Sequence, residues 1–391
     1  LRFQPLLQRD APGGETVLLE TPIRWGAGDP VEAALFDGLL MNADTAPAKA
    51  VETATPEVVT VEWLSREALL ADEATLRRLF GLLVSAHYRT TPADLKRLLD
   101  DPRGRIVILR LGEQVVGAAF VMVEGRLDAA LSTEVRTGRR RPHGHLLPEA
   151  LWAHLGHSEA LEMGFWRVVR IAVHPACRRV GLGRRLLEVV AIEARHGGAD
   201  CWGATFGATA GLLGFWRSAA ADVVRVGVSP GRSSGLVSAI VLTPLTDAGE
   251  VLCVAAKRQL ADELAFALGG PLRDLSPAVA LALLRTCSTP DVSQWPTYVR
   301  GALAGVADRT RSVEVSTAAL WRFSLAALTS ARCADALEEE GRVLLLRRFL
   351  QRHSWSAADV HRPARGRKPL SRIVVRVVQD GLAALGLLGD R

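Results

Sequence analysis

The run "VHPACRRVGLGRRLL", residues 173–187, carries the residue types best suited to holding an anion. Gly181 and Gly183 stand one residue apart, and without Cβ atoms they let backbone N–H groups converge on one point. The amides that open a helix also lack intrahelical partners and lie at its positive end. Three arginines add charge around them: Arg178, Arg179 and Arg184. The run therefore predicts a site for an anion such as a pyrophosphate, the alternative being a tight turn with solvated arginines.

The elements on either side of this run fit that prediction. The β-branched pattern at 167–175 predicts a buried strand before the turn. Apolar residues at helical spacing predict a helix over about 184–196 after it. The run is not a P-loop, since GxxxxGK[ST] is absent from the chain, and it lacks the GxGxxG of a dinucleotide fold.

The patterns between 58 and 245 predict a mixed α/β domain. In order they indicate a strand, two helices, a hairpin, a strand, a helix, a strand, a helix and a pair of strands. The further segments are strands at 58–65, 201–208, 222–228 and 238–245, a hairpin at 104–125, and helices at 73–88, 91–100 and 210–219. Thr91 and Pro92 predict the start of helix 91–100, and Asp94 completes its cap.

The flanks of this domain differ from it. Residues 1–57 are mixed, with a strand pattern at 15–25, a helix capped by Asp29 and Pro30, and a linker composition at 41–57. Residues 246–391 show helical patterns and predict a separate helical tail. A basic patch at 361–372 precedes its last helix.

Composition excludes several classes of protein. The 391 residues are 49% hydrophobic and 23% charged, which is typical of a globular protein. The net charge of +6 weakly favours a polyanionic partner, although only four of the 48 basic residues are lysines. The five cysteines are far apart, so we expect no metal site and reduced thiols in the cytoplasm. No apolar stretch approaches the length of a membrane span, and no signal peptide is apparent.

The glycine run resembles the R/Q-x-x-G-x-G/A signature of the GNAT acetyltransferases, with Arg178, Gly181 and Gly183 in the signature places. Longer strings in the same order are similar to the tRNA(Met) cytidine acetyltransferase family. These strings are "TPIRWGAGDPVE", "SAHYRTTPADLKRLLDDP", "RRPHGHLLPEAL", "RIAVHPACRRVGLGRRLL", "FGATAGLLGFWR" and "SSGLVSAIVLTPL". The resemblance covers residues 1 to about 245, and in the tail "GRKPL" is its main trace.

The resemblance implies a GNAT mixed-sheet domain at 58–245 that takes acetyl-CoA as co-substrate. The loop would hold the pyrophosphate, and the preceding strand would line the pantetheine arm and offer an N–H to the thioester oxygen. The implied cofactor-binding residues are Ile171, Ala172, Val173, Arg178, Arg179, Val180, Gly181, Leu182, Gly183, Arg184 and Arg217. Trp216 could cover the adenine or pack in the core. Gly211 and Ser218 depart from the family pattern and leave Arg217 or Arg184 to hold the adenosine end.

The acceptor implied by the resemblance is the exocyclic amine of cytosine, giving N4-acetylcytidine at the wobble position of elongator tRNA(Met). His87 is the candidate base because imidazole titrates near neutral pH, the alternative being a helix-end residue bonded to backbone. Tyr88 could orient the cytosine or protonate the departing thiolate, or be a structural tyrosine. His174 is interpreted as a turn residue rather than a second base.

Cations outside the cofactor loop suggest where RNA would bind. Arg139, Arg140 and Arg141, beside His143 and His145, could grip tRNA phosphates or form a solvated loop. In the tail the candidates are Arg365, Arg367 and Lys368, again with a solvated basic face as the alternative. We therefore interpret 246–391 as a helical RNA-binding tail.

The family also has an ATP-hydrolysing, helicase-like module before the acetyltransferase domain. Residues 1–57 would be a remnant or linker from it, so ATP or GTP would act only if a separate ATPase module is supplied. Two alternatives to an RNA acetyltransferase remain open at this point. One is a GNAT enzyme for a protein or small-molecule amine, and the other is a non-catalytic RNA-binding remnant.

Overall fold

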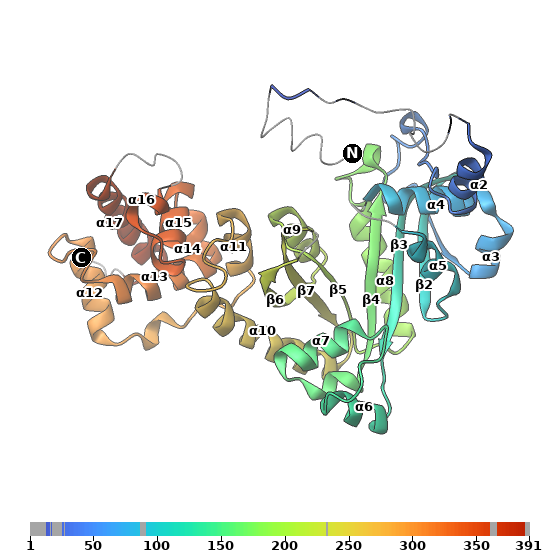
Figure 1. The fold of residues 1–391 in the computed structure, drawn as a ribbon. Helices are drawn as coiled ribbons and strands as arrows, with labels where there is room; N and C mark the ends of the chain where they lie inside the picture. Colours follow the sequence, from blue (N-terminus) through green and yellow to red (C-terminus); the bar gives the residue numbers. More distant parts are fainter. Residues whose placement is uncertain are drawn as a thin grey trace. The chain divides into compact units, whose positions relative to one another are not determined.

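The computed structural model describes residues 13–15, 17, 26, 28–86, 91–231, 234–359 and 366–387. The chain divides into two compact units. The first comprises Leu1–Glu124 with Trp166–Gly197, and the second comprises Gly125–Phe165 with Gly198–Arg391. Figure 1 colours the chain from blue to red and labels its elements.

Four strands, in the order β1-β2-β3-β4, form the sheet of the first unit. They are β1 (Thr60–Leu64), β2 (Gly104–Leu111), β3 (Gln114–Gly125) and β4 (Gly164–Val173). β1 runs antiparallel to β2 with Thr60 opposite Arg110, and β2 runs antiparallel to β3 with Gly104 opposite Met122. The predicted hairpin at 104–125 and the strands around 58–65 and 167–175 are thus confirmed.

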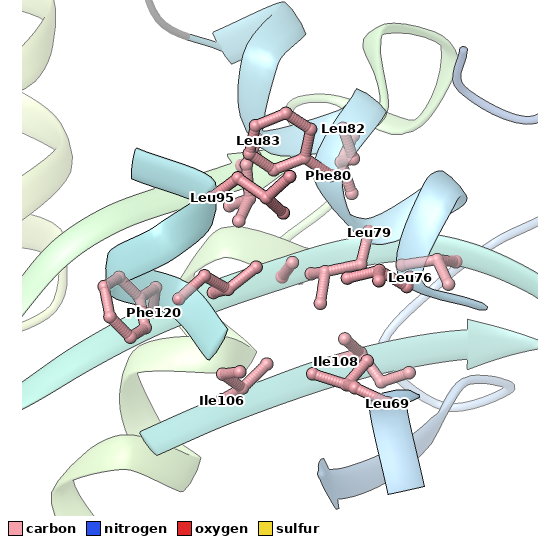
Figure 2. Packing of buried hydrophobic residues seen from close by; sticks show 14 of the residues in the cluster. Leu69, Leu76, Leu79, Phe80, Leu82, Leu83, Leu95, Ile106, Ile108 and Phe120 are labelled. Atoms are coloured by element: carbon pink, nitrogen blue, oxygen red, sulfur yellow. The ribbon is translucent and has the colours of Figure 1, made fainter. Parts of the chain in front are cut away.

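Helices pack on this sheet and close its core. They are α3 (Arg66–Ala71), α4 (Glu73–Ala86), α5 (Pro92–Asp100) and α8 (Leu182–His196), with 3-10 turns at Ala48–Ala50 and Pro175–Cys177. α2 (Pro30–Gly38) precedes them and buries none of its residues. Figure 2 shows Leu79 and Phe80 of α4 and Leu95 of α5 in one hydrophobic cluster with Ile106 and Ile108 of β2. Burial of such side chains contributes about 1.5 to 3 kcal/mol each. The core therefore fixes α4 and α5 firmly against the sheet.

The predicted helix caps are present. The Asp29 carboxylate accepts from the amides of Val31 and Glu32 at 2.9 and 3.0 Å, with Pro30 in the first helical position. Thr91 and Asp94 form a capping box at the start of α5, and the Thr91 amide donates to Asp94 Oδ2 at 2.8 Å. Because the capping residues and proline act locally, the sequence was enough to place both helix starts.

The 41–57 segment, which has the composition of a linker, packs into the first unit. Val51 and Ala54 are fully buried there. The Val51 carbonyl oxygen lies 2.9 Å from Cys177 Sγ, and the Ala46 carbonyl oxygen lies 2.8 Å from His174 Nε2. A few alanines and one valine are sufficient for this burial. Polar residues surround them in the sequence, so the composition of the segment did not predict that it would be buried. The strand expected at 15–25 falls almost wholly outside the described residues.

The second unit contains three strands in the order β5-β7-β6. They are β5 (Cys201–Gly207), β6 (Asp222–Pro230) and β7 (Val237–Pro244), with α9 (Ala210–Ser218) between β5 and β6. β7 pairs antiparallel with both neighbours. These elements agree with the predicted ones, whereas α6 (Ala129–Arg136), α7 (Leu146–Leu155) and the 3-10 turn Ser158–Leu161 were not predicted.

The chain from Asp247 onward is helical in its described part, as expected. Its helices are α10 (Asp247–Ala267), α11 (Pro277–Leu284), α12 (Thr297–Ala307), α13 (Thr317–Thr329), α14 (Ala331–Ala336), α15 (Glu339–Leu345), α16 (Trp355–Ala358) and α17 (Arg367–Ala384), with a 3-10 turn Val292–Gln294 and a π-helical turn Leu346–Leu350. α10 packs on β6 and β7, where Lys257 Nζ contacts Asp222 Oδ2 at 2.7 Å. The division into 1–57, 58–245 and 246–391 remains a prediction.

One detail of the tail corrects the sequence analysis. The basic patch does not wholly precede the last helix, because α17 begins at Arg367 and includes both Arg367 and Lys368 in its first turn. The intrinsic helix propensity of Arg and Lys permits this, although cations at a helix start oppose its dipole. None of the described helices is long and apolar enough to cross a membrane.

Candidate functional site

The turn between β4 and α8 has the sharp geometry that the glycines predicted. β4 ends at Val173, a 3-10 turn follows, and α8 begins at Leu182 with Gly181 as its N-cap. Gly181 has φ +99°, a left-handed conformation that favours glycine. A Cβ atom there would also lie 3.2 Å from Pro56 Cγ. Strand and helix are therefore joined by a turn that residue 181 can make at low cost only as glycine.

The start of α8 leaves its backbone donors open. No side chain among the described residues caps this helix, and the Arg185 amide makes the first intrahelical bond, 3.0 Å to the Gly181 carbonyl. The backbone N–H groups of the first helical turn lack intrahelical partners and lie at the positive end of the helix. Leu182 is buried and anchors the turn, so the open amides sit on a rigid element. Such an arrangement can hold an anion, and that this one does so remains a prediction.

Positive side chains surround the open amides. Arg178, Arg179 and Arg184 are all exposed, as is Val180. Arg178 Nε donates to the Val173 carbonyl at 3.2 Å, which holds that guanidinium beside the end of β4. Arg184 Nε lies 3.5 Å from Glu188 Oε1 one turn along α8. The predicted residues of 178–184 thus lie on one turn, and Ala172 of the preceding strand is buried.

His174, directly after β4, is a structural residue. It is buried, and its Nε2 lies 2.8 Å from the Ala46 carbonyl oxygen, which assigns the proton to Nε2. Its Nδ1 accepts from the Ala176 amide at 3.3 Å. Both ring nitrogens are engaged, which agrees with the interpretation of a turn residue rather than a second base.

An ion pair that the sequence did not reveal joins α5 to the same strand. Arg170 Nη2 lies 2.9 Å from Asp94 Oδ1, and both side chains are largely buried. Burial by itself would raise the pKa of Asp94, but the hydrogen bonds from Thr91 and the Arg170 guanidinium outweigh it and lower that pKa. Asp94 therefore does more than complete the helix cap, because it also ties α5 to β4.

Comparison with known proteins identifies the domain that contains this turn. Residues 78–196 match the family model "GNAT acetyltransferase 2". This segment is a GNAT acetyltransferase domain. The match includes most of α4 and all of α5, β2, β3, β4 and α8.

Curated relatives extend this likeness beyond the GNAT domain. The tRNA(Met) cytidine acetyltransferase TmcA of Nitrosococcus halophilus is 40% identical over 384 residues, covering 97% of this chain and 51% of the relative. The TmcA proteins of Haloferax volcanii and Vibrio cholerae are 38% and 32% identical, covering 87% and 96% of this chain and 45% and 50% of the relatives. The chain spans about half the length of the curated relatives it matches.

The two candidate catalytic residues of the GNAT domain, His87 and Tyr88, lie outside the described residues. The structure describes the chain on both sides of them, with α4 ending at Ala86 and the α5 cap at Thr91. Their roles remain predictions.

Candidate residues for the adenosine end lie on α9 in the second unit. Arg217 is exposed, while Trp216 is buried and stacks on Phe206 with ring centroids 5.6 Å apart. Of the two interpretations of Trp216, core packing is the one its surroundings favour. Gly211 is exposed with open space around its Cα, and Ser218 Oγ donates to the Phe215 carbonyl at 2.7 Å.

The candidate RNA-binding cations are at the surface wherever they are described. Arg139, Arg140 and Arg141 are exposed just after α6, and Arg140 Nη1 lies 3.3 Å from Glu134 Oε2. Arg367 and Lys368 are exposed on α17, and Arg367 Nε lies 3.4 Å from Glu314 Oε1. Arg365 lies outside the described residues. Of the two histidines in the "RRRPHGH" loop, His145 accepts from the Gly125 amide at 2.9 Å.

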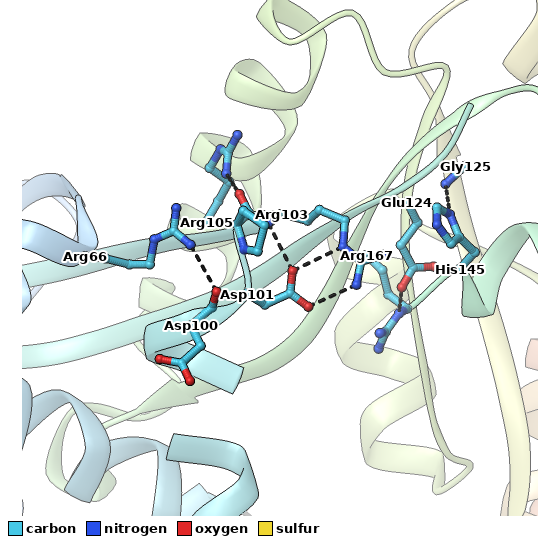
Figure 3. Close-up of polar contacts among 10 residues, drawn as sticks. Arg66, Asp100, Asp101, Arg103, Arg105, Glu124, Gly125, His145 and Arg167 are labelled. Carbon is cyan, nitrogen blue, oxygen red and sulfur yellow. Dashed lines mark hydrogen bonds and ion pairs between the residues drawn. The ribbon is translucent and has the colours of Figure 1, made fainter. Parts of the chain in front are cut away.

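A buried charge pair in the GNAT domain also escaped the sequence analysis. Glu124, at the end of β3, is fully buried, and its Oε1 lies 2.5 Å from Arg167 Nε of β4 (Figure 3). Asp101 and Arg103 form a second pair at 3.0 Å, which lowers the pKa of Asp101. A buried carboxylate needs such a partner because burying an unpaired charge costs free energy.

Among the described residues there is no cluster of metal-binding side chains.

Proposed function

We propose that the chain transfers an acetyl group from acetyl-CoA to the N4 amine of a cytidine in tRNA, forming N4-acetylcytidine at the wobble position of elongator tRNA(Met). The observation that carries this proposal is 40% identity over 97% of the chain to a relative named tRNA(Met) cytidine acetyltransferase. An acceptor that is a protein or a small-molecule amine, or a chain without catalysis, is not favoured, because the curated relatives reported above share that name.

The open start of α8 fits the diphosphate of the donor. The exposed Arg178, Arg179 and Arg184 would neutralise its charge, and the amide N–H groups around Gly181 and Gly183 would donate hydrogen bonds to its oxygens. In this proposal the backbone of 171–173 lines the pantetheine arm, and Arg217 serves the adenosine end. Acetyl-CoA would supply the acetyl group as an activated thioester.

The acceptor amine needs assistance from the protein. Its lone pair is delocalised into the cytosine ring, so the amine is a poor nucleophile that must be positioned closely and must lose a proton. His87 would accept that proton as the N–C bond forms. Tyr88 would protonate the thiolate as the C–S bond breaks, and a thiolate with a pKa near ~8.5 leaves with little help.

The partners of this reaction follow from the charges. Arg139, Arg140, Arg141, Arg365, Arg367 and Lys368 would hold tRNA phosphates. A step driven by ATP or GTP would need a separate ATPase or helicase module. The five thiols are free, which supports the cytoplasm as the proposed compartment.

The test is nucleoside mass spectrometry of tRNA incubated with the protein and with acetyl-CoA labelled in its acetyl group. We expect labelled N4-acetylcytidine after digestion of the tRNA. Absence of label from cytidine, with label on a lysine peptide offered in parallel, would replace this function by acetylation of protein.

Two variants separate the roles within the site. His87→Ala should abolish the label on cytidine and retain acetyl-CoA binding. Gly183→Glu should abolish both, because a carboxylate would stand where the diphosphate binds. Full activity of His87→Ala would show that the base has been assigned wrongly.

A further inference from the structure

A groove of about 740 Å³ lies in the second unit among α10, α11 and α13. Its volume falls within the range of about 300 to 1,000 Å³ that small-ligand sites occupy. None of the residues assigned a role above lines it. One face of α10 forms a long wall, the chain after α11 forms a second, and Trp321 and Leu325 of α13 form the floor.

An aromatic ring stands open at this groove. Phe266, at the end of α10, is 83% exposed, the highest value among the large apolar side chains that the structure describes. Val254, about three helical turns earlier on the same helix, is also exposed. Trp321 adds a second, half-buried aromatic side chain. The side chains of Phe266 and Trp321 therefore provide flat apolar surface on which a bound molecule could pack.

The charges at the groove are mostly positive and unpaired. Arg258 and Arg352 both line it and are exposed, and neither forms an ion pair with any residue in the described ranges. Lys257 also lines the groove, but it forms an ion pair with Asp222 at 2.7 Å. Asp262 is the one carboxylate among the lining residues. An anionic occupant complements these two guanidiniums.

We propose that this groove binds an unpaired nucleotide of the RNA acceptor, with its base against Phe266 and its flanking phosphates against Arg258 and Arg352. The proposal rests on the proposed function, which supplies an RNA. A base in a duplex has both faces covered by its neighbours, whereas an unpaired base can stack on an aromatic side chain. Arginine pairs well with phosphate because its planar fork matches two oxygens. The site is thus suited to a single-stranded loop or end.

The test is fluorescence anisotropy of the full chain with a labelled eight-nucleotide single-stranded RNA and with the same sequence as a duplex. Phe266→Ala should weaken binding of the single strand about tenfold, in line with the loss of one stacked base. Arg258→Gln together with Arg352→Gln should lower the slope of log affinity against log salt by about 1.4 for two phosphate contacts on a single strand. Binding of the duplex should change less than twofold in each case.

Matched controls come from the same helical region. Tyr298→Ala removes another exposed aromatic side chain, and Arg322→Gln removes another exposed cation, neither of which lines the groove. Both should bind the single strand within twofold of the wild type. Thermal unfolding of each variant would confirm that the helices are intact.

Two results would overturn the proposal. One is unchanged affinity of Phe266→Ala for the single strand. The other is a change in the oligomeric state of Phe266→Ala by sedimentation with RNA affinity intact, which would make the groove a protein interface. Failure of the proposed function can be distinguished from failure of this proposal. A wild type that acetylates no cytidine would still bind the single-stranded RNA in the anisotropy assay, and Phe266→Ala would still weaken that binding.

Discussion

Among single residues, Asp94 connects two elements beside the proposed site. Its carboxylate accepts from the Thr91 amide at 2.8 Å and the Thr91 hydroxyl at 2.9 Å, and it pairs with Arg170 at 2.9 Å. One side chain thus caps α5 and binds that helix to the strand that precedes the glycine turn. Neither half of this role depends on the identity of the substrate.

We predict that Asp94→Asn lowers the free energy of unfolding by about 2 kcal/mol at pH 7, the sum of a weakened cap and a lost charge pair. The folded state lowers the pKa of Asp94, so this contribution is fully present above the unfolded pKa near ~3.9 and is lost as pH falls through the folded pKa. Urea unfolding between pH 7 and pH 3 measures it, and the difference from wild type should shrink toward low pH.

The matched control for this change is Glu52→Gln. Glu52 is an exposed carboxylate of the same unit with no ion pair to any described residue. It should leave unfolding within about 0.5 kcal/mol of the wild type, as surface substitutions usually do. A constant difference between Asp94→Asn and the wild type across the pH series would contradict the charge-pair account.

At the scale of elements, the sheet connections depend on glycines whose neighbours leave no room. Gly125 ends β3 with φ +83°, and a Cβ atom there would overlap the Met163 carbonyl oxygen. Gly138 has a similar φ of +71° but open space around it. The two positions therefore share a backbone conformation and differ in steric surroundings.

We predict that Gly138→Ala costs about 1 kcal/mol, the penalty of a left-handed conformation for an L-residue. Gly125→Ala should cost about 3 kcal/mol more, because the clash with backbone adds to that penalty. Thermal or urea unfolding of the two variants compares them directly. Equal losses at both positions would show that the strand end relaxes freely around the added methyl group.

Local patterns predicted most elements and missed those without a clear period. The hairpin at 104–125 and helices α4, α5 and α8 have regular apolar spacing or strong caps, so they could be predicted. α7 could not be predicted, because an arginine-rich segment precedes it and its apolar residues are not confined to one face of the helix. The pairs Arg170–Asp94 and Arg167–Glu124 join residues far apart in the chain, and no local spacing identifies such partners.

The sequence likewise predicted the candidate site that lies in one continuous segment but not the groove that the fold assembles. Gly181, Gly183 and the adjacent arginines lie in one continuous run, so their types and order sufficed to predict an anion site. The groove at Phe266 was not predictable, because its walls come from α10, α11 and α13, and only the fold brings these helices together. Likewise, the exposure of Phe266 depends on packing rather than on its sequence neighbours.

For the whole molecule, the net charge of +6 suits a polyanionic partner, and its effect should depend on salt. We predict that Arg139→Gln with Arg141→Gln weakens tRNA binding and lowers the log–log salt slope by up to about 2, without changing acetyl-CoA binding. Filter binding of tRNA at several salt concentrations measures this slope.

A charge-matched control is Arg66→Gln with Arg195→Gln, which removes two cations from the other unit, Arg195 exposed and Arg66 half-buried. It should leave the salt slope nearly unchanged if the phosphate contacts are local to 139–141. The same reduction in both double variants would mean that tRNA responds only to total charge, and the assignment of these arginines would then be wrong.

The most direct test of the account is calorimetric titration of coenzyme A into the full chain, because the proposed acetyl transfer depends on a diphosphate bound at the start of α8. We predict that the wild type binds, that Gly183→Glu binds at least tenfold more weakly, and that Gly301→Glu, at an exposed helical glycine with open space around it, binds like the wild type. Equal affinity of Gly183→Glu and the wild type, or no binding by the wild type, would contradict it.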